Sequence, residues 1–177
     1  MIIKVGFLTA RKFSLKELHW YILGKLIELI QGKYVHTFVI YMDSCWGSTV
    51  REMSGLGVKK TDWSTYFKKY YNRLEIVDIE TDSIFSYRDF TDFCKNSKAK
   101  YEYKNLIIWQ LVHKVTGKWF GKDTSYRRIC SEDSARAINK AVIGLVQYPD
   151  KVSPTELYDI VTNYSYGRNK QYIHSWN

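Results

Sequence analysis

The amino-acid sequence predicts an α+β fold in which an antiparallel sheet packs against helices within a single domain. Segments rich in β-branched and aromatic residues stand at 2–8, 35–42, 49–53 and 74–79, as is typical of strands. Apolar residues recur at helical spacing elsewhere in the chain. Because the 177 residues include only two prolines and no linker-like run, we expect one domain over residues 1–177.

The first elements in chain order are a strand at 2–8 and a helix. Ser14 and Glu17 form a capping box, Ser-x-x-Glu, whose side chains satisfy the first backbone N–H groups of a helix. The apolar positions of this helix continue to Ile30, and Gly32 stands where a glycine commonly ends a helix.

The clearest strand in the chain is 35–42, Val-His-Thr-Phe-Val-Ile-Tyr-Met. Residues 43–47 are predicted to form a turn, and residues 49–53 a second strand paired with the first. After a glycine-bearing connection at 54–58, a further strand is expected at 74–79. The first two of these strands are therefore predicted to pair as a hairpin.

The second half of the chain is predicted to be mainly helical. Helices are expected at 83–93, at 103–115, from close to Cys130 onward, and from a second capping box at Ser153–Glu156 to about Val161. Pro154 stands at the first helical position, where its missing N–H costs nothing. A polar loop is expected at 118–128, and residues 164–177 carry no clear pattern.

The net charge of +9, with an isoelectric point near 9.3, indicates an acidic partner such as nucleic acid, an anionic membrane surface or a cell-wall polymer. The fifteen tyrosines offer rings on which nucleic-acid bases can stack. The alternative is that scattered lysines and arginines keep an aromatic-rich chain soluble, since no basic block or known binding motif is present.

The location of the chain is predicted from what its sequence lacks. The apolar N-terminal stretch is too short for a secretory signal, and no run approaches the roughly 20 apolar residues of a membrane span. Three cysteines cannot all pair, which favours a reducing compartment. We therefore expect a cytoplasmic protein, or one that is phage-encoded or carried on a virion. No metal-ligand spacing is present, and no cofactor is expected.

Cys130 is the candidate nucleophile. It follows Arg127 and Arg128 and precedes a polar turn into a predicted helix, and both cations and a helix N-terminus favour the reactive thiolate. Backbone N–H groups of Cys130 and Ser131 could then hold an oxyanion. The alternative is a buried structural cysteine, as we expect for Cys94 within a helix; Cys45 lies in the predicted turn.

His36 is the candidate base, and Glu52 the residue that would orient its ring. His36 stands inside the clearest strand and shares a face with Phe38, Ile40 and Met42. Glu52, on the next strand, comes beside it if the two strands form a hairpin, and a carboxylate there fixes the imidazole tautomer. The alternatives are a core histidine and a surface glutamate. Three further histidines are weaker candidates: His19, His113 and His174.

Four short segments in this order resemble the circularly permuted branch of the NlpC-type papain-like hydrolases, most closely the YiiX-like proteins and more distantly the lecithin:retinol acyltransferase-like proteins. Residues 34–41 are similar to the family's histidine strand, residues 49–58 to its second strand, and Arg128–Glu132 to the motif in which Cys-Ser-Glu begins a helix. Residues 153–158 are similar to a segment that often follows. The resemblance covers roughly residues 34–160.

The resemblance implies a permuted papain-like fold and a cysteine peptidase or amidase with Cys130, His36 and Glu52 as catalytic residues. It departs at the N-terminus, where Val5–Leu8 lacks the family's aspartate and a long helix precedes His36. The expected reaction passes through a thioester on an amide, isopeptide or ester substrate such as a peptide, protein or cell wall. The alternatives are a thiol acyltransferase acting on lipids and a non-catalytic polyanion-binding module.

Overall fold

The computed structural model describes residues 1–10, 15, 18–42, 44–47, 59–81, 87–96, 100–101, 108, 110–118 and 127–174. Within these ranges the chain has an α+β fold with one five-stranded antiparallel sheet and six α-helices. A short parallel pair, β6 (Lys100–Tyr101) and β7 (Arg127–Arg128), stands apart from that sheet. The α+β class and the antiparallel sheet predicted from the sequence are therefore confirmed, while the papain-like fold that the resemblance implies stays a prediction.

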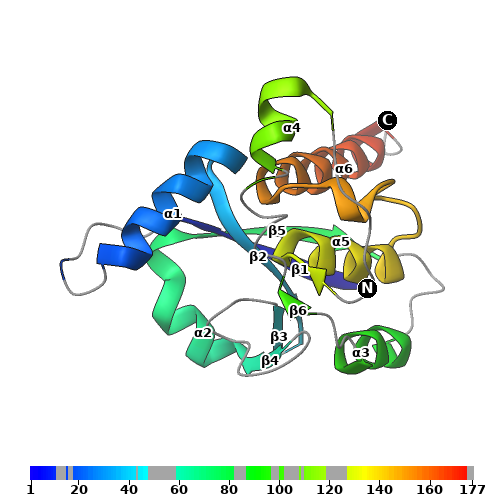
Figure 1. Ribbon diagram of the computed structural model, residues 1–177. Helices are drawn as coiled ribbons and strands as arrows, with labels where there is room; N and C mark the ends of the chain where they lie inside the picture. The colour runs from blue at the N-terminus through cyan, green and yellow to red at the C-terminus, as the bar shows by residue number, and fades with distance from the viewer. Residues whose placement is uncertain are drawn as a thin grey trace.

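The five strands lie in the order β4-β3-β2-β1-β5, and each neighbouring pair runs antiparallel (Figure 1). They cover the following residues: β1 Ile2–Thr9, β2 Tyr34–Tyr41, β3 Ser44–Gly47, β4 Lys59–Asp62 and β5 Leu74–Glu80. Strand β2 is almost wholly buried and β1 mostly so, because helices cover both faces of these central strands. The predicted strands at 2–8, 35–42 and 74–79 thus form, within a residue or two.

Six α-helices accompany the sheet within the described residues. The helices cover these residues: α1 Leu18–Gln31, α2 Trp63–Tyr70, α3 Tyr87–Asn96, α4 Gln110–Thr116, α5 Cys130–Ala141 and α6 Pro154–His174. Gly32 follows the end of α1 as predicted; its φ of 92° is left-handed, and its N–H donates to the carbonyl of Glu28. Among the described residues, no helix combines the length and apolarity that crossing a bilayer needs.

The two faces of the sheet carry separate apolar clusters. On one face, which we call the α5 face, Val5, Phe7 and Val39 pack with residues of α5 and α6, including Ile138 and Leu157. On the other, the α2 face, the cluster contains these residues: Leu8, Phe38, Ile40, Cys45, Tyr66 and Tyr70. Successive side chains of a strand point to opposite faces, so each residue of β2 can be assigned to one helix layer.

A β-bulge interrupts this alternation at the start of β2. Leu8 pairs with His36 and Thr9 pairs with Tyr34, so Val35 is the additional residue. Tyr34 consequently lies on the α5 face, where its ring is 5.3 Å from that of Phe7. The bulge therefore changes the face to which β2 directs its side chains immediately before His36.

Gly6 is required by the α2 face. A Cβ at this position would lie 2.3 Å from the nearest ring atom of Phe38. The ring of Phe38 therefore lies directly over the backbone of β1, in space that a side chain would otherwise occupy.

The structure corrects three predictions. Residues 44–47 form β3 rather than a turn, because pairing with β2 buries Cys45 and Trp46 on opposite faces. Met42 does not continue the strand of His36; it has a φ of 51° and is 68% exposed. The third correction concerns α6, which runs to His174 instead of ending near Val161, because nothing after Pro154 removes a backbone donor.

Other boundaries differ or cannot be compared. The structure has α3 over Tyr87–Asn96 and α4 over Gln110–Thr116, which overlap the helices predicted at 83–93 and 103–115; the predicted starts at 83 and 103 lie outside the described residues. The elements β4 and α2 have no predicted counterpart. The capping box at Ser14 and Glu17 and the predicted strand at 49–53 lie outside the described residues.

Candidate functional site

Cys130 is the first residue of α5, at the position that the sequence predicts. Its side chain is 1% exposed, and the first backbone bond of the helix runs from Asp133 N–H to the Ile129 carbonyl over 3.1 Å. The N-cap residue is Ile129, which makes no side-chain cap bond. Because Ile129 has no polar side chain, it does not cap the first N–H groups of α5, whose partial positive charge favours an anion; Glu132 and Asp133 in the same turn add negative charge.

The first turn of α5 is buried and held in place by polar contacts. Ser131, which is fully buried, donates a hydrogen bond from its hydroxyl to the carbonyl of Val152 over 2.6 Å. Glu132 is 2% exposed, and its Oε1 accepts from Arg136 over 3.0 Å. The bond to Val152 therefore fixes the start of α5 to the segment that leads into α6.

His36 is buried on β2, and its ring stacks on that of Phe38, with centroids 5.8 Å apart and planes 30° apart. Within the described part of the chain, its Nε2 atom has no hydrogen-bond partner. Burial and, to a smaller extent, the positive charge of Arg73 lower the pKa of His36 to about 3. His36 is therefore neutral at physiological pH.

The structure places His36 and Cys130 on opposite sides of the sheet. His36 pairs with Leu8 and stacks on Phe38, and both of these belong to the α2 face. Helix α5 packs on the other face, where Thr37 is the next β2 residue and pairs with Phe7. The described arrangement therefore does not bring these two predicted catalytic residues together.

The other sequence-predicted residues are placed as follows. Glu52 lies outside the described residues, so its relation to His36 stays a prediction. Cys94 falls within α3, as expected of a helical cysteine. Cys45 is 1% exposed and packs on the α2 face, not in a turn.

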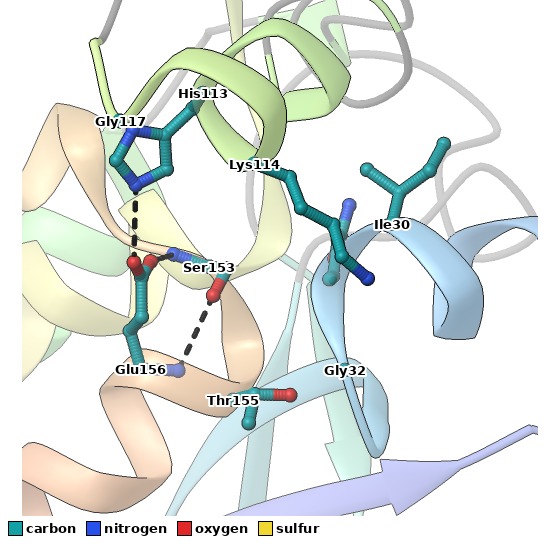
Figure 2. A pocket seen from close by; sticks show the side chains of 9 residues that line it. Ile30, Gly32, His113, Lys114, Gly117, Ser153, Thr155 and Glu156 are labelled. Atoms are coloured by element: carbon teal, nitrogen blue, oxygen red, sulfur yellow. Dashed lines mark hydrogen bonds and ion pairs between the residues drawn. The ribbon is translucent and has the colours of Figure 1, made fainter.

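A cavity of about 350 Å³ lies where α1 ends, α4 passes and α6 begins. Nine residues line it: Ile30, Gln31, Gly32, His113, Lys114, Gly117, Ser153, Thr155 and Glu156. Figure 2 shows His113 directed toward Glu156, with Lys114 and Ile30 at the other side. The volume of this cavity falls within the range of small-ligand sites.

His113 and Glu156 form the polar pair of this cavity. The Nε2 atom of His113 lies 3.3 Å from Oε1 of Glu156. The other carboxylate oxygen accepts from the N–H of Ser153 over 2.7 Å, while the Ser153 hydroxyl accepts from the N–H of Glu156 over 3.2 Å. The predicted capping box is therefore confirmed, and Glu156 also contacts a histidine.

The sequence makes His113 a weaker candidate than His36 and gives no sign of its contact with Glu156. The capping box identifies Glu156 from sequence alone, but its contact with His113 bridges 43 positions in the chain. A contact between two helices at that separation has no local signal. The apolar cavity wall beside it likewise depends on how α1 and α4 pack.

The cavity adjoins the start of α5. Ser131 bonds to Val152, and the next residue, Ser153, lines the cavity. Because Leu157 and Val161 of α6 belong to the α5-face cluster, the His113–Glu156 pair lies on that side of the sheet. Of the histidines whose side chains the structure describes, His113 is the one on the same side as Cys130.

The described residues include no group of three or more His, Cys, Asp or Glu side chains positioned to hold a metal ion. Comparison of the chain with protein-family models, curated proteins and solved structures finds no match. A functional assignment therefore depends on the residues of the site and on the sequence resemblance.

Proposed function

We propose that the chain is a thiol hydrolase of the permuted papain-like type, with Cys130 as its nucleophile. The observation that carries the proposal is the position of Cys130 at the first residue of α5, in a buried turn that the Ser131–Val152 bond holds. The absence of a cap from Ile129 supports it further, since helix N–H groups can then stabilise a thiolate and an oxyanion.

The proposed reaction is acyl transfer through a thioester. A neutral histidine takes the thiol proton, and the sulfur attacks the carbonyl carbon of an amide, isopeptide or ester. The tetrahedral intermediate collapses, the C–N or C–O bond breaks, and the histidine returns the proton to the leaving group. Water then adds to the thioester, again with histidine as base, and releases the acid and free Cys130.

Two histidines compete for the role of base. The family resemblance assigns it to His36, which is on the wrong face in the described arrangement and has a low pKa. For His36 to reach Cys130, the bulge would have to shift from Val35 to a position after His36. A one-residue slip of a strand exchanges the faces to which its side chains point. His113 needs no such change of face, and Glu156 already contacts its ring.

Trapping of the acyl-enzyme tests the nucleophile. The full chain is mixed with an activated ester such as p-nitrophenyl acetate, and the modified residue is located by peptide mass spectrometry. We expect a stoichiometric burst of p-nitrophenol, an acetyl group on Cys130, and loss of both in Cys130→Ala. A burst that persists in Cys130→Ala would reject the proposal.

Substitution of each histidine then identifies the base. His36→Gln and His113→Gln are compared for turnover and for the pH dependence of acylation. General-base catalysis raises a reaction rate by roughly a hundredfold or more. Substitution of the histidine that acts as base should therefore lower the acylation rate far more than substitution of the other histidine. If neither substitution lowers the rate more than tenfold, neither His36 nor His113 is the base.

An exposed apolar surface on α1 favours one alternative use of the same chemistry, acyl transfer to a lipid. In that reaction a lipid hydroxyl or amine, not water, attacks the thioester. Adding lysophospholipid to the acyl-enzyme distinguishes the two: a transferase forms acylated lipid, whereas a hydrolase releases only the free acid.

A further inference from the structure

Helix α1 exposes a stripe of large aliphatic side chains. Leu18, Ile22, Leu26 and Leu29 are 42%, 57%, 41% and 69% exposed. Their spacing of four, four and three residues places them along one side of the helix. The sheet-facing side of α1 is separate, because Ile27 and Ile30 are buried. The α1 stripe, as we call these four residues, therefore has no partner within the described part of the chain.

The neighbouring helix α4 also exposes apolar side chains. Helix α4 packs against α1, and Lys114 of α4 donates to the carbonyl of Leu29. Two apolar side chains of α4, Leu111 and Val115, are 46% and 77% exposed. Isolated surface leucines need no explanation, but a continuous row on one helix with more on the next marks an interaction surface.

Charge selects among the partners that could cover the stripe. Lys25 stands beside it, where it pairs with Glu28, and Lys114 on α4 and Lys118 just after that helix are exposed. The whole chain carries a net charge of +9. A second copy would bring the same charge to the interface and be repelled, whereas an anionic bilayer attracts both the lysines and the apolar row.

We propose that the α1 stripe docks the protein on the surface of an anionic lipid bilayer. A helix of 14 residues is about 21 Å long and can lie flat in the headgroup region, with its leucines at the boundary of the acyl chains. The end of α1 and helix α4 also line the cavity of about 350 Å³. Docking therefore brings this cavity close to the lipid surface. The docking proposal does not depend on the chemistry of Cys130.

Vesicle co-sedimentation of the full chain tests the proposal. The vesicles contain phosphatidylcholine alone or phosphatidylcholine mixed with phosphatidylglycerol. We expect binding to the mixed vesicles that weakens as salt is added, because salt screens the attraction between the lysines and the anionic headgroups. Ile22→Ser combined with Leu29→Ser should lower the partition coefficient about tenfold or more, since two aliphatic side chains no longer enter the lipid.

A matched pair on another surface provides the control. Phe67 and Tyr71 are 44% and 63% exposed on α2 and the turn after it, so Phe67→Ser with Tyr71→Ser removes similar apolar exposure. This control and Cys130→Ala should bind as the unmodified chain does. Circular dichroism confirms that each variant is folded.

Three results would overturn the docking proposal. The first is no binding to either vesicle, and the second is equal binding by the α1 double variant and the unmodified chain, which would show attraction by charge alone. The third is a dimer that the α1 substitutions convert to a monomer without any vesicle binding, which would assign the stripe to a second copy. Each result leaves the acylation of Cys130 unaffected, so the two proposals fail separately.

Discussion

The imidazole of His36 stacks on the ring of Phe38, 5.8 Å away between centroids, on the sheet face opposite to α5. The residue between them, Thr37, is fully buried and points to the α5 face. A shift of β2 by one residue would therefore move His36 from the α2 face to the face on which Cys130 lies. The bulge at Val35 fixes the present register, in which His36 faces α2.

Acid should destabilise the protein through His36. Its pKa is about 3 when folded but near 6.5 when exposed, so below pH 6.5 the unfolded chain binds a proton that the folded chain does not. This contribution to stability is complete above about pH 6.5 and is lost progressively as the pH falls toward 3. We expect a loss of about 2 kcal/mol at pH 5 from this group.

Urea unfolding of the unmodified chain and of His36→Leu, at pH 7 and at pH 5, measures this effect. The leucine variant has nothing to titrate at that position, so its unfolding free energy should change less between the two pH values. Identical pH dependence in both proteins would show that His36 is protonated when folded.

Gly6→Ala should destabilise the protein by about 2–3 kcal/mol, because the new methyl group would overlap the ring of Phe38. Adding Phe38→Leu should recover part of the loss, since the two effects are coupled. Gly167→Ala in α6 is the control: a Cβ there meets nothing within 4 Å, and alanine favours the helix. The double-mutant cycle is measured by urea unfolding. Strict additivity would contradict the packing of Phe38 over β1.

Ser131→Ala should cost about 1–3 kcal/mol, because it removes the bond to Val152 and leaves that carbonyl unpaired in the interior. Thr37→Val is the opposite case. Thr37 is also fully buried, but its hydroxyl has no partner among the described residues, so valine should stabilise the protein by about 1 kcal/mol. Chemical unfolding compares the two. Equal destabilisation would mean that the hydroxyl of Thr37 is bonded.

The sequence predicts those parts of the fold that are determined locally. The central strands follow from β-branched and aromatic runs, the start of α6 from its capping box, and the end of α1 from Gly32. Residues 44–47 were wrongly predicted, because Cys45 and Trp46 become a strand only when β2 pairs with them. Local preference favoured a turn, and sheet pairing overrode it.

The candidate site divides in the same way. The start of α5 at Cys130 is predicted by the polar turn and the apolar spacing that follows. The face of His36 is not predictable from alternation alone, because a bulge of one residue precedes it. The contact of His113 with Glu156 depends on the packing of α4 against α6, to which no short segment points.

Alkylation of the two buried cysteines tests the central claim, that the start of α5 activates Cys130. Cys130 and Cys45 are each 1% exposed, so a difference in burial cannot explain a difference in their reaction rates. Cys130 stands at a helix N-terminus, whereas Cys45 lies within a strand. The folded chain is treated with iodoacetamide near neutral pH, and each modified peptide is quantified over time by mass spectrometry. We expect Cys130 to react at least about tenfold faster than Cys45, because the thiolate is the species that attacks iodoacetamide. Equal rates, or faster modification of Cys45, would contradict it.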